Sequence, residues 1–266
     1  MYNLTLCAVF KDEEKWLREW LVYHLIVGVD HFVLFNNGKP QPSFSIIEPF
    51  IDCGAATYYD FDHPQGDLQI AAYDLALQYF RNKTKWLAYI DLDELVYPIN
   101  NDHIYHVLQH FETEDIIGLN IPVATFGTSN LDYSPLLQSE AFVHRAVDKH
   151  PSNYTSKQFL RPHFHKQYQY GGNVNNPGMV DPDKKQSFYN KQFRPSPFLR
   201  INHYGTRSLE DWNKKVKRGW PIGRPGGDIN KAMWDKKFKM LNQNEVFDDS
   251  IYRFLPELKL RLCMFS

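Results

Sequence analysis

The stretch Trp86–Pro98, WLAYIDLDELVYP, joins a short apolar run to three acidic residues within four positions, Asp91, Asp93 and Glu94. The run around Ile90 is too short to cross a membrane and too continuous for a one-sided surface strand, so it predicts a buried parallel strand. Crowded carboxylates repel one another and resist burial, and a divalent cation with oxygen ligands would hold them together. The stretch therefore predicts a strand that ends at a metal or ligand site.

The spacing of the two aspartates suits this interpretation. Side chains alternate along a strand, so Asp91 and Asp93 would point the same way while Leu92 packs behind them. Taken alone, the tripeptide is a weak signal, because an acidic turn in water after a strand has the same sequence. The flanking sequence has to decide between the two.

The composition is that of an ordinary folded protein. The chain has 266 residues, 43% of them hydrophobic, a mean hydropathy of −0.50 and a net charge of −1. This charge gives no reason to expect nucleic-acid binding, and no apolar run approaches the roughly 18 residues of a membrane span. The N-terminus lacks the pattern of a secretion signal, and Cys7, Cys53 and Cys263 show no metal spacing, so we expect a cytoplasmic location.

Strands and helices alternate over the first hundred residues. Apolar runs predict strands at Leu4–Phe10, His31–Phe35 and Ala55–Phe61, and helical spacing predicts helices at Asp12–Val27, near Ile46–Ile51 and at Gln65–Arg81. This alternation predicts an α/β fold with a mostly parallel sheet and helices on both faces. Ligands bind beyond the carboxyl ends of such strands. Polar residues follow these three strands and the strand around Ile90, at Lys11–Glu13, Asn36–Asn37, Asp60–Asp62 and Asp91–Glu94.

The second half is less regular. We expect strands at Ile116–Val123, Ala141–Val147, Lys157–Arg161 and Phe198–Asn202, a long functional loop at His163–Pro197, and a helix capped by Ser208 that runs to Arg218. Residues 184–224 hold eleven cations (Lys184, Lys185, Lys191, Arg194, Arg200, Arg207, Lys214, Lys215, Lys217, Arg218 and Arg224) against two acids. Such an asymmetry favours an anionic partner, for which a diphosphate is suitable.

Four blocks of sequence carry a family resemblance: CAVFKDEEKWLREWLVYHLIVGVDHFVLFNN, QIAAYDLAL, WLAYIDLDELVYP and INHYGTRSLEDWNKKVKRG. Their order and spacing, from about Leu4 to Gly219, resemble glycosyltransferase family 92, also called the DUF23 type, of the glycosyltransferase-2-like set. The resemblance implies a GT-A, Rossmann-like fold in one domain, 1–266. Residues 1–100 would bind a nucleotide sugar, and residues 101–266 would bind the acceptor and include a C-terminal basic segment. It also implies a divalent metal, Mn²⁺ or Mg²⁺.

The resemblance also assigns roles to single residues. Asp91 and Asp93 match the two aspartates of a DxD motif, the first near the donor ribose and the metal, the second on the metal. Lys11, Asp12 and Glu13 match contacts to the base and ribose, and we expect Asn37 to contact the donor as well. Relatives usually carry an acidic residue followed by Ser or Thr where this chain has Asn36-Asn37-Gly38-Lys39. His203 is the candidate for a third metal ligand, and a hydrogen-bonded core histidine is its alternative.

Sugar transfer needs further groups. Negative charge grows on the departing diphosphate, and a metal and nearby cations stabilise it. Lys157, Arg161, Arg207 and Lys214 compete for this role. An inverting enzyme also needs a carboxylate base for the acceptor hydroxyl. Asp132, Glu140, Asp181 and Asp183 are candidates, with Glu140 preferred and Asp181 kept beside it.

The expected function is therefore that of a metal-dependent hexosyltransferase. It would move a sugar from a nucleotide diphosphate, with UDP as the expected nucleotide, to a hydroxyl of a glycan or glycolipid. The configuration at the anomeric carbon would be inverted, and the product would belong to polysaccharide biosynthesis. Peripheral association with the inner membrane face is compatible with the absence of an apolar span. A nucleotidyltransferase is an alternative, although KDEEKW after the first strand lacks the usual glycine-rich loop. A carbohydrate-binding protein without catalysis is another, but it would not need Asp91 and Asp93.

Overall fold

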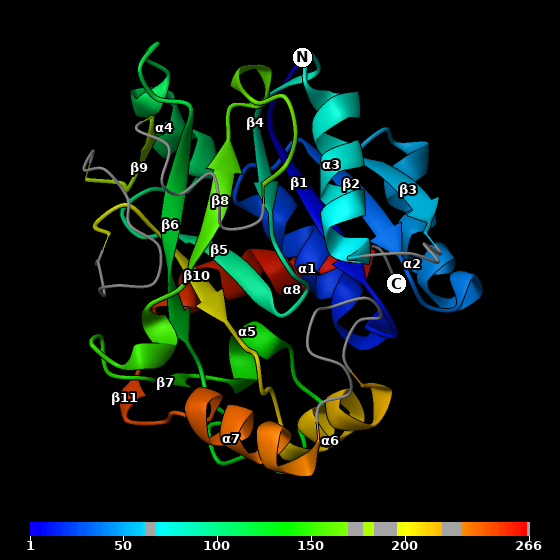
Figure 1. The fold of residues 1–266 in the computed structure, drawn as a ribbon. Coiled ribbons are helices and arrows are strands. Elements are labelled where there is room, and N and C mark those ends of the chain that lie inside the picture. The colour runs from blue at the N-terminus through cyan, green and yellow to red at the C-terminus, as the bar shows by residue number, and fades with distance from the viewer. Residues whose placement is uncertain (62–66, 170–177, 184–195, 220–229, 265–266) are drawn as a thin grey trace.

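One large sheet with helices on both faces forms the centre of the molecule (Figure 1). The computed structural model describes residues 1–61, 67–169, 178–183, 196–219 and 230–264. Its main sheet has the strand order β3-β2-β1-β4-β8-β6-β10-β5, and β9 pairs with β6. Five of the eight neighbouring strand pairs are parallel, namely β1·β2, β2·β3, β1·β4, β6·β10 and β6·β9. The predicted α/β class with a mostly parallel sheet is therefore confirmed.

The first half follows the predicted alternation closely. Its elements are β1 (Tyr2–Phe10), α1 (Glu14–Ile26), β2 (His31–Asn36), α2 (Pro40–Asp52), β3 (Ala56–Asp60), α3 (Leu68–Phe80) and β4 (Thr84–Tyr89). Cys7 of β1 lies opposite both Val33 of β2 and Tyr89 of β4. The chain thus moves outward from β1 to β3 and then returns to the other side of β1. Ligands bind at such a reversal of strand order, in the crevice beyond the carboxyl ends of the two strands.

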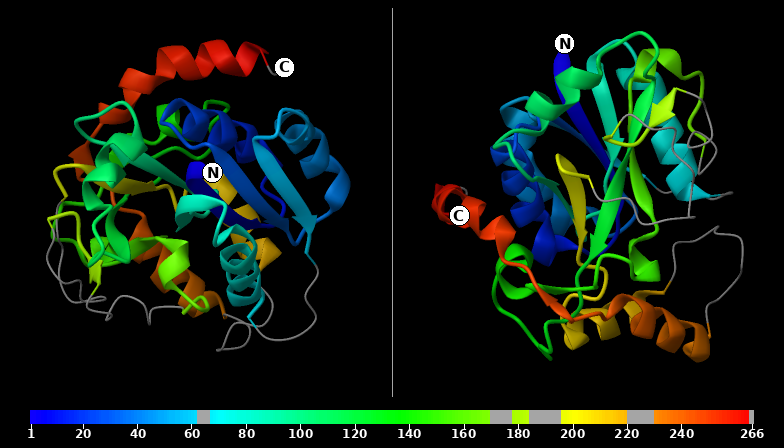
Figure 2. Two further views of the ribbon diagram at one scale, coloured as in Figure 1. Left: turned by 90° about the horizontal axis from the view of Figure 1, so that it is seen from above. Right: turned by 90° about the vertical axis from the view of Figure 1, so that its left-hand side faces the viewer.

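Alternation along β1 explains why helices cover both faces. Leu4, Leu6 and Ala8 belong to the apolar core beneath α1 and α2, whereas Cys7 belongs to a second core beneath α3. Successive side chains of a strand point to opposite faces, so one strand contributes to both layers. The C-terminal helix α8 (Leu255–Met264) packs outside α1, on the side away from α3 (Figure 2).

The second half is mixed. It contains β5 (Glu94–Pro98), α4 (Ile104–Leu108), β6 (Gly118–Thr125), α5 (Gln138–Ala141), β7 (His144–Arg145), β8 (Ser156–Leu160), β9 (Met179–Val180), β10 (Leu199–His203), α6 (Leu209–Arg218), α7 (Lys231–Leu241) and β11 (Val246–Phe247). β8 runs antiparallel between β4 and β6, and β5 runs antiparallel to β10. The expected strand at Ala141–Val147 is wrong: the segment begins in α5, and only His144 and Arg145 pair, with β11.

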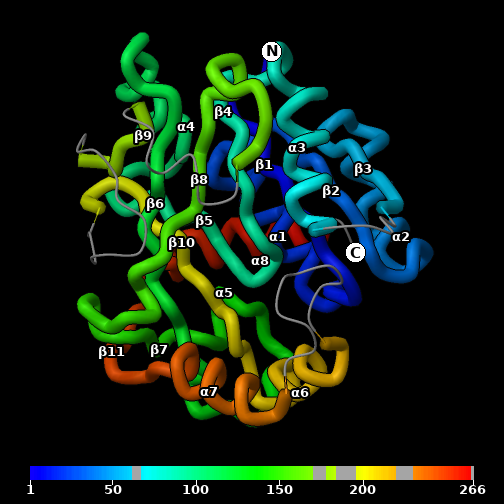
Figure 3. The backbone as a smooth tube through the Cα atoms, in the orientation of Figure 1, coloured from blue at the N-terminus to red at the C-terminus, as the bar shows by residue number. Residues whose placement is uncertain are grey.

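The helices α6 and α7 lie beyond the edge of the sheet where β1 and β4 end (Figure 3). The predicted cap of α6 is confirmed, because the Ser208 hydroxyl accepts a hydrogen bond from the backbone N–H of Asp211, 3.2 Å away. α6 and α7 pack through Trp212 and Trp234, whose ring centroids are 5.5 Å apart. None of the helices in the described ranges is long and apolar enough to cross a lipid bilayer.

Candidate active site

The acidic sequence DLDE forms a turn between β4 and β5. The backbone N–H of Glu94 donates to the carbonyl oxygen of Asp91 at 3.0 Å, and the indole N–H of Trp20 donates to the carbonyl oxygens of both residues, at 3.1 and 3.0 Å. The expectation that Asp91 and Asp93 share one side of a strand is therefore wrong. The chain turns at Asp91 so that β5 can pair with β10, and the two carboxylates meet different partners.

Asp91 faces the side of the sheet that carries α3. Its carboxylate accepts hydrogen bonds from Lys157 Nζ at 2.6 Å, and from Gln69 Nε2 and the Tyr73 hydroxyl at 3.3 Å each. Lys157 also lies 2.7 Å from the carboxylate of Glu94. One lysine of β8 therefore joins two of the three acidic residues.

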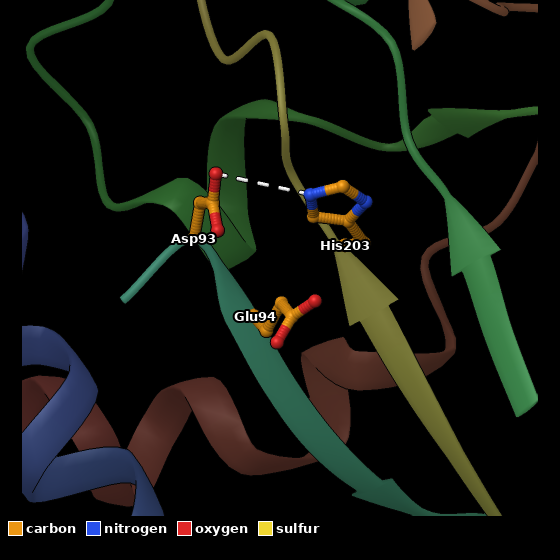
Figure 4. A group of neighbouring side chains, drawn as sticks. All are labelled: Asp93, Glu94 and His203. Carbon is orange, nitrogen blue, oxygen red and sulfur yellow. Dashed lines mark ion pairs between the residues drawn. The ribbon is translucent and has the colours of Figure 1, made fainter. Parts of the chain in front are cut away.

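Asp93 lies beside a histidine and a second lysine. Its Oδ2 is 2.6 Å from Lys215 Nζ and 3.8 Å from His203 Nε2. His203, at the end of β10, is the pairing partner of Glu94 at the start of β5. One ligand atom from each of Asp93, Glu94 and His203 lies within 4.8 Å of the others (Figure 4).

Two carboxylate oxygens and one imidazole nitrogen form a donor set that suits a first-row divalent ion such as Mn²⁺. Register across β5 and β10 explains how a histidine so distant in sequence joins the acidic turn. The donor atoms present therefore fit the expected ion, with Glu94 as a ligand that the sequence interpretation did not assign.

The charged groups around the turn shift one another's pKa values. Burial would raise the pKa of Asp93, but Lys215, His203 and Arg207 together outweigh it and hold that pKa well below its ordinary value. Burial raises the pKa of Glu94, and the attraction of Lys157 offsets this only in part. Burial would lower the pKa of Lys157, yet Asp91 and Glu94 raise it on balance. The cluster thus keeps two ammonium ions close to three carboxyl groups.

Two adjoining cavities open at this turn. The first, of about 190 Å³, lies where β1, β2 and β4 end, and residues that line it are Val9, Phe10, Lys11, Glu13, Asn37, Leu68, Gln69, Asp91, Leu92, Asp93, Lys215, Arg218, Gly219, Trp234 and Lys237. The second, of about 410 Å³, is lined by residues 12–16, 205–207, Asp93, Asp211, Lys214, Lys215, Lys217 and Arg218. Glu13, Asp93, Lys215 and Arg218 border both. The first cavity occupies the predicted crevice at the reversal of strand order.

Most of the donor-binding residues expected from sequence meet here. Lys11, Glu13, Asn37 and Asp91 line the first cavity, and Asp12, Glu13, Arg207 and Lys214 line the second. Lys157 reaches the site through Asp91. Arg161 does not: its guanidinium donates to the carbonyl oxygens of Thr113 and Ile116. Of the basic segment, Lys184, Lys185, Lys191, Arg194 and Arg224 lie outside the described residues, as do Asp62 and much of the 163–197 loop.

The four candidate bases do not gather at the cavities. Among the described lining residues, Asp132, Glu140, Asp181 and Asp183 are absent from both. The carboxylate of Glu140 lies 2.5 Å from Lys259 Nζ on α8, and Asp181 is buried directly after β9. The carboxylates that do line the second cavity are those of Asp12, Glu13, Glu14, Asp93 and Asp211.

Several residues of the site were not assigned from sequence. Lys215, Arg218, Gln69, Trp234 and Lys237 all line the first cavity. The two α6 cations belong to the basic segment, but their spacing gave no reason to choose them over their neighbours. Glu94 stands next to Asp93 in the acidic run, but nothing in the sequence indicated that it would lie beside His203.

The sequence model of glycosyltransferase family 92 matches residues 2–249. A glycosyltransferase family 92 protein of Oryza sativa subsp. japonica is 22% identical over 129 residues, which are 48% of this chain and 22% of that protein. Galactan beta-1,4-galactosyltransferase GALS3 of Arabidopsis thaliana is 29% identical over 104 residues, 36% of this chain and 21% of that protein.

Among solved structures, S. aureus TarS 1–349 covers 90% of this chain and 70% of its own, with 9% identity and a TM-score of 0.45. The matches to the rice protein and to a Ricinus communis family 92 protein span only about a quarter or less of those proteins' length, 22% and 24%. The family match, in contrast, extends over nearly all of the present sequence and includes the acidic turn and the late His203 block. The chain belongs to glycosyltransferase family 92.

Proposed function

We propose that the protein is a metal-dependent glycosyltransferase that moves a sugar from a nucleotide diphosphate to a glycan hydroxyl. The observation that carries the proposal is the group of Asp93, Glu94 and His203, of which Asp93 lines the cavity where the strand order reverses. Family membership supports the reaction class. It also favours transfer over the nucleotidyltransferase and carbohydrate-binding alternatives.

The metal site would consist of Asp93, Glu94 and His203, with Asp91 and Lys157 holding the turn behind it. When bound, a Mn²⁺ or Mg²⁺ ion supplies Lewis-acid stabilisation of the charge on the departing diphosphate. Glu94 already binds the backbone N–H of Asp91 at 3.0 Å, so its carboxylate is oriented before an ion arrives. Such orientation lowers the cost of assembling the site.

The remaining residues of the first cavity would bind the nucleoside. Phe10, Leu68 and Trp234 give it apolar walls, and Lys11 and Asn37 give it polar groups. A flat apolar wall with a few hydrogen-bonding groups is suitable for a base and its ribose. The second cavity is also lined by Asp93 and would receive the acceptor. The base for an inverting reaction stays a prediction, and Glu140 and Asp181 are not among the described residues that line either cavity.

The donor sugar and acceptor are also proposals. The names of two Arabidopsis relatives refer to galactan beta-1,4-galactosyltransferases, so UDP-galactose is the first donor to test. A glycan or glycolipid acceptor, cytoplasmic location and contact with the inner membrane face are retained as proposals. Fractionation of cells with and without detergent would test the last two.

The experiment is a thermal shift assay with UDP and Mn²⁺, combined with measurement of UDP release from UDP-galactose. We expect stabilisation of the wild type that requires both components, and loss of stabilisation and UDP release in Asp93→Asn. Asp102→Asn changes an exposed carboxylate and serves as the control. A full response in Asp93→Asn would refute the metal assignment, and release of pyrophosphate from a nucleoside triphosphate and a sugar phosphate would favour the nucleotidyltransferase.

A further inference from the structure

Two cations of α6 neutralise carboxylates of the candidate active site. Lys215 Nζ lies 2.6 Å from Asp93 Oδ2, and Arg218 Nη1 lies 2.9 Å from Glu13 Oε1. Residues three apart in a helix share a face, so both side chains extend from α6 in the same direction. α6 therefore places two positive charges against the acidic wall of the site.

These two cations differ from the other lysine at the turn. Lys215 and Arg218 line both cavities. Lys157 also contacts acidic residues, but it is absent from the described lining of either cavity. Lys157 is therefore a counter-charge behind the turn, whereas Lys215 and Arg218 border the space that ligands would enter.

Lys215 is paired with the carboxylate oxygen of Asp93 that a metal ion would need. Oδ2 of Asp93 is the oxygen that contacts Lys215 Nζ, and it is also the oxygen nearest His203. A divalent cation on Asp93 and the ammonium of Lys215 would repel each other at this separation. Metal binding and the Lys215–Asp93 ion pair are therefore in competition.

Both carboxylates would keep a positively charged partner after Lys215 and Arg218 leave them. Glu13 has a second partner, because Arg207 Nη1 lies 2.6 Å from its Oε2, so Arg218 can leave without exposing an unpaired buried carboxylate. Asp93 is likewise neutralised by the ion that replaces Lys215. A nucleoside diphosphate brings negative charge to the same cavity and would accept hydrogen bonds from both cations.

We propose that Lys215 and Arg218 are exchangeable counter-ions. In the free protein they neutralise Asp93 and Glu13. Once a divalent ion has taken Asp93, Lys215 turns to the diphosphate of the donor together with Arg218. This inference rests on the proposed function and deepens it, since it assigns the diphosphate to Lys215 and Arg218 in place of Arg161 and Lys214.

The test measures two affinities whose changes have opposite signs. In Lys215→Ala we expect Mn²⁺ alone, titrated by calorimetry, to bind about tenfold more tightly, because the competing ammonium is gone. At saturating Mn²⁺, UDP should bind that variant about tenfold more weakly, because a charged hydrogen bond to the diphosphate is lost. A folding defect would weaken both affinities and so cannot imitate this result.

Two further variants complete the design. Lys236→Ala removes an exposed lysine from the neighbouring α7 and should leave both affinities unchanged. Arg218→Ala should weaken UDP binding while Mn²⁺ binding stays within about twofold, since Arg207 still neutralises Glu13. Unchanged or weaker Mn²⁺ binding in Lys215→Ala, or unchanged UDP binding, would overturn the inference. Failure of the wild type to bind UDP with Mn²⁺ would instead remove the proposed function itself.

Discussion

The guanidinium of Arg207 donates a hydrogen bond to the carbonyl oxygen of Leu92, 2.8 Å away, at the centre of the turn that carries Asp91 and Asp93. Arg207 also donates to Gln138 Oε1 at 3.2 Å and is ion-paired with Glu13. Its backbone has a φ of 52°, which is uncommon for a residue with a side chain and persists only where surrounding contacts enforce it. The residue thus connects the start of α1, α5 and the acidic turn.

Replacement of Arg207 by lysine tests this connection. Lysine keeps the positive charge but cannot bind three partners with one planar group. We expect Arg207→Lys to lower the free energy of unfolding by about 2 kcal/mol and to weaken Mn²⁺ binding about tenfold. Urea denaturation and Mn²⁺ titration measure the two effects. Arg145→Lys, which changes a guanidinium paired with Asp248 outside both cavities, should lower stability without changing Mn²⁺ affinity.

Trp20 supports the same turn from α1. Its fully buried indole N–H donates to the carbonyl oxygens of Asp91 and Glu94. Trp20→Phe removes this donor, so we expect a loss of about 2 kcal/mol in stability and weaker Mn²⁺ binding. Trp86→Phe is the matched control, because Trp86 is equally buried and donates instead to Glu112. Equal Mn²⁺ affinities in the two variants would contradict a role of Trp20 in the site.

The contribution of each acidic residue to Mn²⁺ binding follows from its place in the site. Glu94 belongs to the group with Asp93 and His203, whereas Asp91 contacts Lys157, Gln69 and Tyr73. We therefore expect Glu94→Gln to weaken Mn²⁺ binding by about 100-fold and Asp91→Asn by about tenfold. Isothermal titration in the absence of nucleotide measures both. The reverse order would show that Asp91, and not Glu94, completes the metal site with Asp93 and His203.

His24 makes stability depend on pH. It is fully buried, and burial lowers its pKa from 6.5 to about 3, although a hydrogen bond to the Trp20 carbonyl oxygen opposes the shift. The unfolded chain therefore binds a proton that the folded chain does not bind between these values. The stabilisation is complete above pH 6.5 and is lost as the pH falls, by about 1.4 kcal/mol per unit.

Urea denaturation between pH 6.5 and pH 5 should accordingly show a loss of about 2 kcal/mol from this group. His24→Gln should remove this part of the slope, because an amide does not titrate in this range. His106→Gln changes an exposed histidine of α4 and should leave the slope as it is. A wild-type slope that persists in His24→Gln would assign the pH dependence to other groups.

Local patterns in the sequence predicted the fold class and the edge where the site lies. The apolar runs and helical spacings of the first hundred residues identify β1 to β4 and their helices, because burial on both faces makes a strand continuously apolar and burial of one face gives a helix a period of 3.6. Polar residues after these strands then had to meet at one edge, and Lys11, Asn37 and Asp91 do so.

The tertiary structure decided which charged groups meet. Lys215 contacts Asp93 across 122 positions of sequence, while Arg161, an equally plausible cation, turns to backbone carbonyl oxygens elsewhere. The turn at Asp91–Asp93 follows from the pairing of β5 with β10, which no local period encodes. The sequence alone thus determined the α/β layers and the acidic end of the central strand. The partners of each carboxylate depended on long-range packing, since hydrogen bonds and ion pairs carry no periodic signal along the chain.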